Sequence, residues 1–390
     1  MNKRVMTLHA TSVLGALAAC MQPALAVDIK AGDWTVSVGG NVNAYYTFVD
    51  CSGGQVGGLA LGSQALGCGG KDSRTTIGNG LLPSGLVTSA SSTQGGYDIK
   101  ALIGIYAHTA TDSAIAQNSG VDVRQAFFTF GNAELGTVKL GRDYGIFGAN
   151  AILNDMTLMG VGAPVQATQR GRVALGHIGA GYAYLNHYGQ IAYTTPKMAS
   201  GLSVDLGLMS PVADTPIVAP SAYSAGSTPQ FQAQLTLTQG EIKAWLGAKT
   251  QRFDPAAAGT PDLTMRAIEL GALYQSGPLG LLLNVQRGTG LGILSDGDQG
   301  DVRTTHVFAQ GTWKLSDKVK LGLSYGHSKN NDGTAGTGGL KSNENVTLGA
   351  YYALNSAITL VAEGGQTRSK AFAGPRDKMN GVALGGIIFF

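Results

Sequence analysis

The sequence predicts an all-β protein, a sixteen-stranded antiparallel transmembrane β-barrel with short periplasmic turns and long extracellular loops. Three observations predict it. Apolar and polar residues alternate with period two along most of the chain, as in a strand with two unlike faces. Charged residues make up only 13% of the chain, about half the usual share, and glycines number 59. The connections between the predicted strands alternate between short and long.

The first 26 residues are predicted to be a secretory signal peptide. Lys3 and Arg4 provide its positive start, an apolar stretch follows, and Ala24-Leu25-Ala26 is a small-residue cleavage site. The mature barrel domain then covers residues 27–390.

A second export route stays open, because Leu17-Ala18-Ala19-Cys20 resembles a bacterial lipoprotein box with Cys20 as the lipidated first residue. Both routes take the chain out of the cytoplasm. Removal of residues 1–26 takes away Lys3 and Arg4 and no acid, so the net charge falls from +3 to +1. This weak charge argues against a nucleic-acid partner held by electrostatic attraction.

Each strand is predicted from a run of alternating residues. In one such run Phe231, Ala233, Leu235 and Leu237 share a face, and Gln or Thr residues occupy the other face. Pro83 interrupts the second strand, which requires a bulge or an edge position there. The predicted strands are 34–49, 73–92, 97–109, 121–131, 137–143, 187–196, 201–210, 230–239, 241–252, 263–275, 279–288, 303–315, 318–328, 344–354, 357–368 and 380–390.

The connections have two clearly different lengths. Short ones such as "QG" and "SGP" form tight hairpins, so that neighbouring strands run antiparallel. Short turns at one end and long loops at the other are typical of an outer-membrane barrel. The long loops are predicted at 50–72, 110–120, 144–186, 211–229, 253–262, 289–302, 329–343 and 369–379.

A water-soluble β-sandwich would show the same alternation, since the pattern does not say which face lies inside. The export signal and the even strand count favour a closed barrel, which leaves no unpaired strand edge in lipid. Aromatic residues near strand ends also fit the interface girdles of a membrane barrel. These aromatic residues are Trp34, Phe48, Tyr97, Tyr274, Trp313 and Phe390.

The chain ends in "GVALGGIIFF", in which alternate residues form an apolar face. If this last strand pairs with the first, the ring closes and the apolar face meets lipid. In this ending, in "VRQAFFTFGNAELGTVKLGRDYG" (123–145) and in "YGQIAYTTPKMASGLSVDLGLMSP" (188–211), the sequence resembles the general diffusion porins of Gram-negative bacteria, of the beta-proteobacterial type. The resemblance covers the whole mature chain.

The resemblance implies a homotrimer in the lipid of the bacterial outer membrane, with a water-filled channel for small hydrophilic solutes and ions and with no cofactor. In this family the barrel-assembly machinery reads a terminal Phe that follows apolar residues at alternate positions. The residues that match this signal are Val382, Leu384, Ile388 and Phe390.

The same resemblance implies that the long third loop, roughly 144–186, folds inward and narrows the channel. A loop this long without strands of its own is usually functional or disordered, and its apolar content argues against disorder. "LNDM" places Asp155 where the family carries an acidic residue at the constriction. Family loops often carry a second acid, but residues 157–163 contain none, so the acidic side is expected to be weaker here.

Basic residues are expected to face this acid across the channel. Arg74 in "DSRTT" and Arg124 in "VRQAFF" match arginines of the family, and Arg170 or Arg172 in "QRGR" aligns more loosely as a third. Opposite charges across a narrow opening create a transverse field in which polar solutes orient. The alternative is that these arginines are solvated charges at loop ends.

Other charged residues are predicted to line the pore because strand parity puts them on the polar face, where water solvates them. Three basic candidates against one acid at the constriction suggest a weak preference for anions, although the sequence does not decide the sign of the selectivity. The predicted pore-lining residues are Lys100, Lys139, Lys243, Lys249, Lys318, Lys320 and Glu363.

Cys51 and Cys68 flank a Gly-rich loop, and an even cysteine count in an exported chain suggests a disulfide between them. A metal site is the alternative, but no His or acidic residues lie nearby at zinc-ligand spacing.

Three other functions remain open. Within transport, the alternative is a substrate-specific channel. Outside transport, the alternatives are an outer-membrane enzyme and a protein that binds partners with its surface loops. The histidines are scattered and none lies in a hydrolase or metalloprotease motif, so we do not expect an enzyme.

Overall fold

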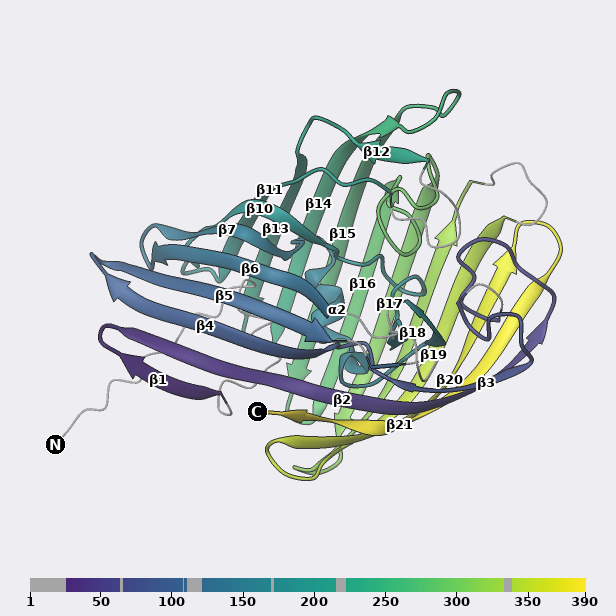
Figure 1. Cartoon of the computed structure of the whole chain (residues 1–390), viewed down its shortest axis with the longest axis horizontal. Coiled ribbons are helices and arrows are strands. Elements are labelled where there is room, and N and C mark those ends of the chain that lie inside the picture. Colours follow the sequence, from purple (N-terminus) through teal and green to yellow (C-terminus); the bar gives the residue numbers. More distant parts are fainter. Residues whose placement is uncertain are drawn as a thin grey trace.

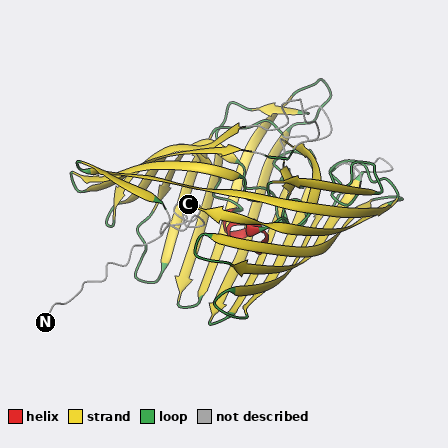
Figure 2. Cartoon of the chain, turned by 60° about the horizontal axis from the view of Figure 1, so that its bottom comes forward, coloured by secondary structure: helices red, strands yellow, loops and turns green. Residues whose placement is uncertain are grey.

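The structure is a computed structural model that describes residues 26–63, 66–107, 109–110, 121–169, 172–214, 222–332 and 339–390. In this described part of the chain, nineteen strands form a single antiparallel sheet, and two more form a small separate hairpin. The sheet is rolled into a ring of tilted strands, and a short helix lies inside it (Figures 1 and 2). Among the described residues, no helix is long and apolar enough to cross a membrane.

The bounds of the elements follow the predicted pattern closely. The helical segments are α2 (Ala149–Asn154) and the 3₁₀ helix η2 (Met156–Met159). The strands are β1 (Val27–Ala31), β2 (Trp34–Gly53), β3 (Ser73–Gly78), β4 (Ser84–Gln94), β5 (Tyr97–Ala107), β6 (Val121–Asn132), β7 (Gly136–Tyr144), β8 (Pro164–Gln169), β9 (Arg172–Ala174), β10 (His187–Thr194), β11 (Leu202–Met209), β12 (Tyr223–Ala225), β13 (Gln230–Gln239), β14 (Ile242–Pro255), β15 (Leu263–Ser276), β16 (Leu279–Thr289), β17 (Arg303–Lys314), β18 (Val319–Asn330), β19 (Leu340–Ala353), β20 (Ile358–Ala371) and β21 (Arg376–Phe389).

The predicted sixteen-stranded barrel is confirmed. The short strands β1, β3 and β12 only extend the sheet, so sixteen of its nineteen strands make the ring. The first of the sixteen, β2, pairs with β4 over Thr35–Asn41 and with the last, β21, over Asn41–Gly53. This pairing on both sides closes the barrel and leaves β2 and β21 without a free edge.

Two predictions about individual elements are wrong. The strand predicted over 73–92 is divided into β3 and β4, and the residues before Pro83 leave the sheet and bend inward. The amide of Leu81 donates to the carbonyl oxygen of Gly160 at 2.9 Å, and a Cβ on Gly80 would lie 2.2 Å from that same oxygen. The stretch predicted to lack strands, 144–186, contains the helices α2 and η2 and the hairpin β8–β9.

Polar residues point into the barrel and apolar residues point outward. On β13, Gln232 and Gln234 are at most 1% exposed, whereas Phe231 is 41% exposed and Leu235 is 39% exposed. A soluble sandwich would bury the opposite face. The outward apolar surface is therefore the surface that meets lipid.

The last strand shows the same arrangement. Leu384 is 56% exposed and Phe390 is 45% exposed, while Ile387 between them is buried. Phe390 and Gly40 exchange two backbone hydrogen bonds of 2.7 and 3.0 Å. These bonds hold the apolar chain end in the ring next to β2 (Figure 1).

Candidate constriction inside the barrel

The third loop, residues 145–186 between β7 and β10, lies inside the barrel and is held by inward side chains of the wall. Gln232 of β13 accepts hydrogen bonds from the amides of Ile146 and Phe147 at 2.8 and 2.9 Å. Glu269 of β15 accepts one from the amide of Gly148 at 2.9 Å. These contacts fix the entry of the loop just before α2.

The middle of the loop is held from two other directions. On β17, the side-chain amide of Gln310 accepts from the amide of Met156 at 2.7 Å and donates to the carbonyl of Asn154 at 2.9 Å. The hydroxyl of Tyr45, on β2, donates to the carbonyl of Met159 at 2.6 Å. The short helices α2 and η2 therefore cross the lumen between strands far apart in the sequence (Figure 2).

Glu363 of β20, a predicted pore-lining residue, is a further attachment point of the loop. One carboxylate oxygen accepts from the amides of Val161 and Gly162 at 2.8 Å each. The other accepts from the hydroxyl of Tyr351 at 2.7 Å. Because both oxygens are occupied and the residue is only 6% exposed, Glu363 positions the loop and presents little charge to the lumen.

Asp155, the acid expected at the constriction, is buried between α2 and η2. Its Oδ1 accepts from the amide and hydroxyl of Thr157 at 2.8 and 2.7 Å, so it caps η2. Its Oδ2 accepts from the hydroxyl of Tyr182 at 2.7 Å and lies 3.1 Å from Nδ1 of His177.

The surroundings of Asp155 set its ionisation. Burial raises the pKa of the carboxyl, but the electrostatic interaction with His177 and the hydrogen bonds from His177, Tyr182 and Thr157 outweigh burial and hold the pKa below its ordinary value. The carboxylate therefore stays ionised, but its side chain has no exposed surface.

Arg124 lies on the wall of β6, next to the third loop. Its Nε donates to Asp122 at 2.9 Å, and its Nη1 donates to the hydroxyl of Tyr184 at 3.3 Å. Its guanidinium also lies 5.9 Å from the centre of the Tyr106 ring. Arg124 borders a gap of about 20 Å³ whose other lining residues are Leu81, Leu82, Pro83, Tyr144, Ile152, Leu153, Leu158, Tyr184 and Leu185.

A larger space, which we call the vestibule, lies at the short-turn end of the barrel. Its volume is about 380 Å³, and it is bordered by the loop residues Leu153 and Leu158, by Gly277 in a short turn, and by Lys314 and Lys320. Leu153 and Leu158 line both the gap and the vestibule. The two spaces therefore border the same part of the third loop.

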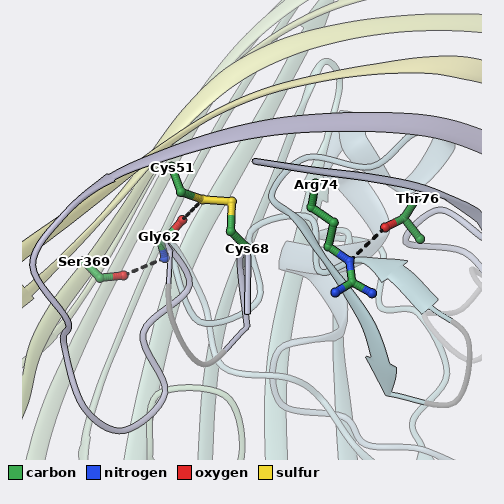
Figure 3. The surroundings of a disulfide bond; sticks show 6 residues. All are labelled: Cys51, Gly62, Cys68, Arg74, Thr76 and Ser369. Carbon is green, nitrogen blue, oxygen red and sulfur yellow. Dashed lines mark hydrogen bonds between the residues drawn. A yellow bond between two sulfur atoms is a disulfide. The ribbon is translucent and has the colours of Figure 1, made fainter. Parts of the chain in front are cut away.

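Arg74, another arginine predicted at the constriction, does not border the gap. Arg74 is half-buried on β3, where its Nε donates to Oγ1 of Thr76 at 3.3 Å (Figure 3). Arg170 lies outside the described residues, and so does the side chain of Arg172 at the start of β9.

The predicted pore lysines fall into three groups. Lys139 and Lys249 are buried in ion pairs with Asp143 and Asp296. Lys318 is exposed in the turn before β18, not on the strand.

The remaining pore lysines keep part of their surface accessible. Lys100 and Lys320 have intermediate exposure on β5 and β18, as has Lys243 on β14. The ammonium of Lys243 donates to Oδ1 of Asn150 at 2.6 Å, and that of Lys320 lies 5.1 Å from the centre of the Tyr351 ring.

The predicted disulfide between Cys51 and Cys68 is present (Figure 3). It closes part of the first loop, residues 54–72, which also folds into the barrel. The amide of Gly62 donates to Oγ of Ser369 at 2.8 Å. Val56 is buried in one apolar cluster with the third loop, so two loops fill the outer part of the lumen.

The comparisons with known proteins agree with this architecture. A family model described as Gram-negative porin matches residues 10–371. The chain belongs to the Gram-negative porins. A comparison with curated protein sequences finds no match to this porin.

Solved structures of similar fold cover nearly the whole porin. The outer membrane channel DcaP of Acinetobacter baumannii is 17% identical with a TM-score of 0.69, covering 93% of this chain and 99% of that chain. The anion-selective porin from Comamonas acidovorans is 18% identical with a TM-score of 0.65, covering 92% and 100%. OmpF of Salmonella typhi, in complex with daunomycin, is 13% identical with a TM-score of 0.65, covering 93% and 100%. At these identities the likeness shows the fold.

The family and the barrel together make this porin a channel of the outer membrane through which solutes diffuse. Its assembly signal at the C-terminus and its signal peptide stay predictions, and Cys20 lies outside the described residues.

Sequence reasoning missed the residues that hold the third loop in place. His177 and Tyr182 were not expected to contact Asp155, because they are far from it in the sequence. Gln232, Glu269 and Gln310 were not singled out either. The alternation of the strands could have identified these three residues. It places their long polar side chains on the inward face of middle strands, where they reach a loop that crosses the lumen.

Proposed function

We propose that this porin passes small hydrophilic solutes and ions by passive diffusion with a modest preference for anions. The observation that carries the proposal is that basic side chains inside the barrel are more accessible and less often paired than acidic ones. Lys100, Lys243 and Lys320 keep part of their surface accessible and form no ion pair within the described part of the chain.

The inward carboxylates around the third loop are different, since each is at most 6% exposed. Asp143 and Asp296 pair with lysines, while backbone amides or a histidine occupy the others. A carboxylate with its oxygens taken by fixed donors attracts a passing cation weakly, whereas an accessible ammonium attracts anions. The five carboxylates are Asp143, Asp155, Glu269, Asp296 and Glu363.

The zero-current potential in a KCl gradient across a planar bilayer tests this preference. Replacing Lys100, Lys243 and Lys320 together by Gln is expected to lower the permeability ratio of chloride to potassium. Lys318→Gln is the matched control, because Lys318 is exposed in a turn and should leave the ratio unchanged. A cation-selective wild type, or an unchanged ratio in the triple variant, would contradict the proposal.

We infer that the gap beside Arg124 is the narrowest passage and that Arg124 contributes to its field. The support is its position, since Arg124 lines the same gap as Leu153 and Leu158 of the third loop, and the volume of this gap is only about 20 Å³. Because Arg124 is only 5% exposed and pairs with Asp122, Arg124→Gln is expected to lower the anion preference less than the triple lysine variant does, and to change the rate at which small anions pass. If the same bilayer measurement shows no change, the solute path lies elsewhere.

A substrate-specific channel is the second candidate, and the lining of the gap favours it. Leu81, Leu82, Pro83 and Ile152 give the passage mostly apolar walls, which a strongly hydrated solute enters only by shedding water. Conductance that rises in proportion to salt supports the general pore. Flux that saturates for one solute supports the specific channel.

A homotrimer is proposed from the family. OmpT of Vibrio cholerae, whose fold this chain shares with a TM-score of 0.52 at 14% identity, has been solved in a trimer form. Mass measurement of the detergent-purified porin before and after heating tests the assembly.

No catalytic activity or surface-binding role is proposed. The acid–histidine contact between Asp155 and His177 is the arrangement most similar to a catalytic pair, but both side chains are completely buried. A solute in the lumen therefore has no access to either group.

A further inference from the structure

Three arginines border one groove on the outward surface of the barrel. Arg266 of β15, Arg287 of β16 and Arg303 of β17 line this groove, whose volume is about 430 Å³. The strand register places Arg266 and Arg303 opposite the same residue, Thr289, from its two sides. With neighbouring strands about 4.8 Å apart, the backbones of Arg266 and Arg303 lie about 10 Å from each other. Arg287 precedes Thr289 by two residues and shares its face.

Two of these arginines have no anionic partner among the described residues. Arg303 is paired with Asp332 through contacts of 2.8 and 2.6 Å. Arg266 and Arg287 are exposed, and neither forms an ion pair with any residue that the structure describes. Two guanidinium groups on one surface without a counter-charge repel each other, so an anion between them would be stabilising.

The groove lies where the apolar band of the barrel ends on the long-loop side. On β15 the outward residues below Arg266 are Ile268, which is 60% exposed, and Leu270, which is 63% exposed, and the band ends at Tyr274. Arg266 lies about 27 Å along the strand from Tyr274, or about 20 Å in height at the usual tilt. The apolar band of such barrels is about 25 Å tall, so Arg266 lies at the outer headgroup layer, and Arg287, opposite Ile268 and one outward position lower, reaches that layer with its long side chain.

The rest of the groove suits an acyl chain. Phe231 and Ile268 stand on its sides, and the small Ala248 lies between them, opposite Ile268 in the strand register. The groove thus combines an apolar trough, which continues into the lipid-facing surface, with guanidinium groups that lie in the same two rows of paired residues as Phe231 and Ile268.

We propose that this groove binds a phosphorylated lipid of the outer leaflet, with its phosphate groups between Arg266 and Arg287 and an acyl chain along Phe231, Ala248 and Ile268. Arginine recognises phosphate through two parallel hydrogen bonds, and its long side chain reaches the headgroup layer from the edge of the apolar band. A soluble anion would use the arginines but not the apolar trough.

Native mass spectrometry of the full porin in phosphatidylcholine nanodiscs tests the site. The discs contain either a bis-phosphorylated glycolipid, lipid A, or the same lipid with its phosphates removed. Wild type is expected to retain the phosphorylated lipid, and Arg266→Gln/Arg287→Gln to retain it at least about tenfold more weakly, because two charge-assisted contacts are lost. Bilayer conductance of the variant should be unchanged, which shows that it is folded.

Arg368→Gln/Lys378→Gln is the matched control. It removes two outward basic residues from the same end of the barrel, where Arg368 lies 3.8 Å from Glu344 and opposite Lys378. Its lipid retention should match that of wild type.

Four results would overturn the proposal. Equal loss in both double variants would mean general charge attraction, and equal retention of the dephosphorylated lipid would exclude phosphate recognition. Displacement of the lipid by millimolar inorganic phosphate would indicate a site for free anions. A changed oligomeric state in the Arg266→Gln/Arg287→Gln variant would make the groove a contact between subunits.

Discussion

A single carboxylate organises the part of the third loop that crosses the lumen. Asp155 accepts hydrogen bonds from Thr157 and Tyr182 and contacts His177, so it ties η2 to residues more than twenty positions later. Several fixed donors compensate the cost of burying its charge. The residue that the sequence suggested as a field-forming charge thus acts first as a structural bridge within the loop.

Replacing Asp155 with Asn should loosen this loop, because one oxygen acceptor becomes an NH₂ donor that faces the hydroxyl of Tyr182. We expect faster hydrogen exchange of the amides of residues 156–160, equivalent to a local loss of about 1–3 kcal/mol. Hydrogen-exchange mass spectrometry at neutral pH measures it. Asp332→Asn, on an exposed loop with Arg303 as partner, is the control and should leave these peptides protected.

The same bridge has a predictable pH dependence. The pKa of Asp155 is lower in the folded loop than its ordinary value of about 3.9, so its contribution is complete above that value and is lost as the pH falls below it. Protection of residues 156–160 should therefore decline in wild type only in strong acid. Protection that stayed constant through strong acid would contradict this link to Asp155.

At the scale of elements, two loops determine how narrow the lumen is. The third loop is fastened by side chains of β2, β13, β15, β17 and β20. The first loop is tied to its own strand by Cys51–Cys68 and to β20 by the contact between Gly62 and Ser369. Their apolar residues pack together, so each loop is stabilised by the other loop as well as by the barrel wall.

Removing the disulfide tests this arrangement. In Cys51→Ser/Cys68→Ser the first loop loses a crosslink between residues 17 positions apart, a constraint of about 3 kcal/mol in the chain-entropy model. We expect a larger or noisier single-channel conductance and faster hydrogen exchange in residues 54–63. The matched control is Ser52→Ala, next to the bridge. Unchanged conductance and exchange would mean that the wall contacts alone hold the loop.

At the scale of the molecule, the ring of strands inverts the usual arrangement of a soluble protein. Leu348, in the middle of β19, is 62% exposed on the outside, while its neighbour Thr347 is completely buried inside. The outward face is stable only in hydrocarbon, and closure between β2 and β21 satisfies the backbone of the two strands that would otherwise be edges.

A charge placed on the outward face should therefore be costly. Leu348→Arg is expected to lower the free energy of unfolding in lipid vesicles by about 2–4 kcal/mol, because it puts a cation into the middle of the apolar band. Thr312→Arg is the control, since Thr312 borders the vestibule, where water solvates the charge. Equal losses for the two variants would contradict the assignment of inside and outside.

Strand periodicity and turn length were enough to predict the ring, because each strand of a membrane barrel carries its own two-faced pattern. The disulfide followed from two cysteines around one loop. The division at Pro83 was predicted only as an irregularity, because whether the chain bulges or leaves the sheet depends on the carbonyl of Gly160, which comes from another loop. The hairpin β8–β9 was also missed, although its two strands pair with each other within the third loop.

The sequence by itself determined the sixteen strands, their two faces and their closure, since these follow from local alternation and from the need to pair every backbone group in lipid. Only the tertiary structure decided what fills the ring. In the sequence Asp155 is an acid of a long loop and Glu363 is an acid on the polar face of a strand, yet both are buried by partners far away along the chain. Which charges reach the water of the lumen depends on how the loops fold inward, and those contacts join residues that no local pattern relates.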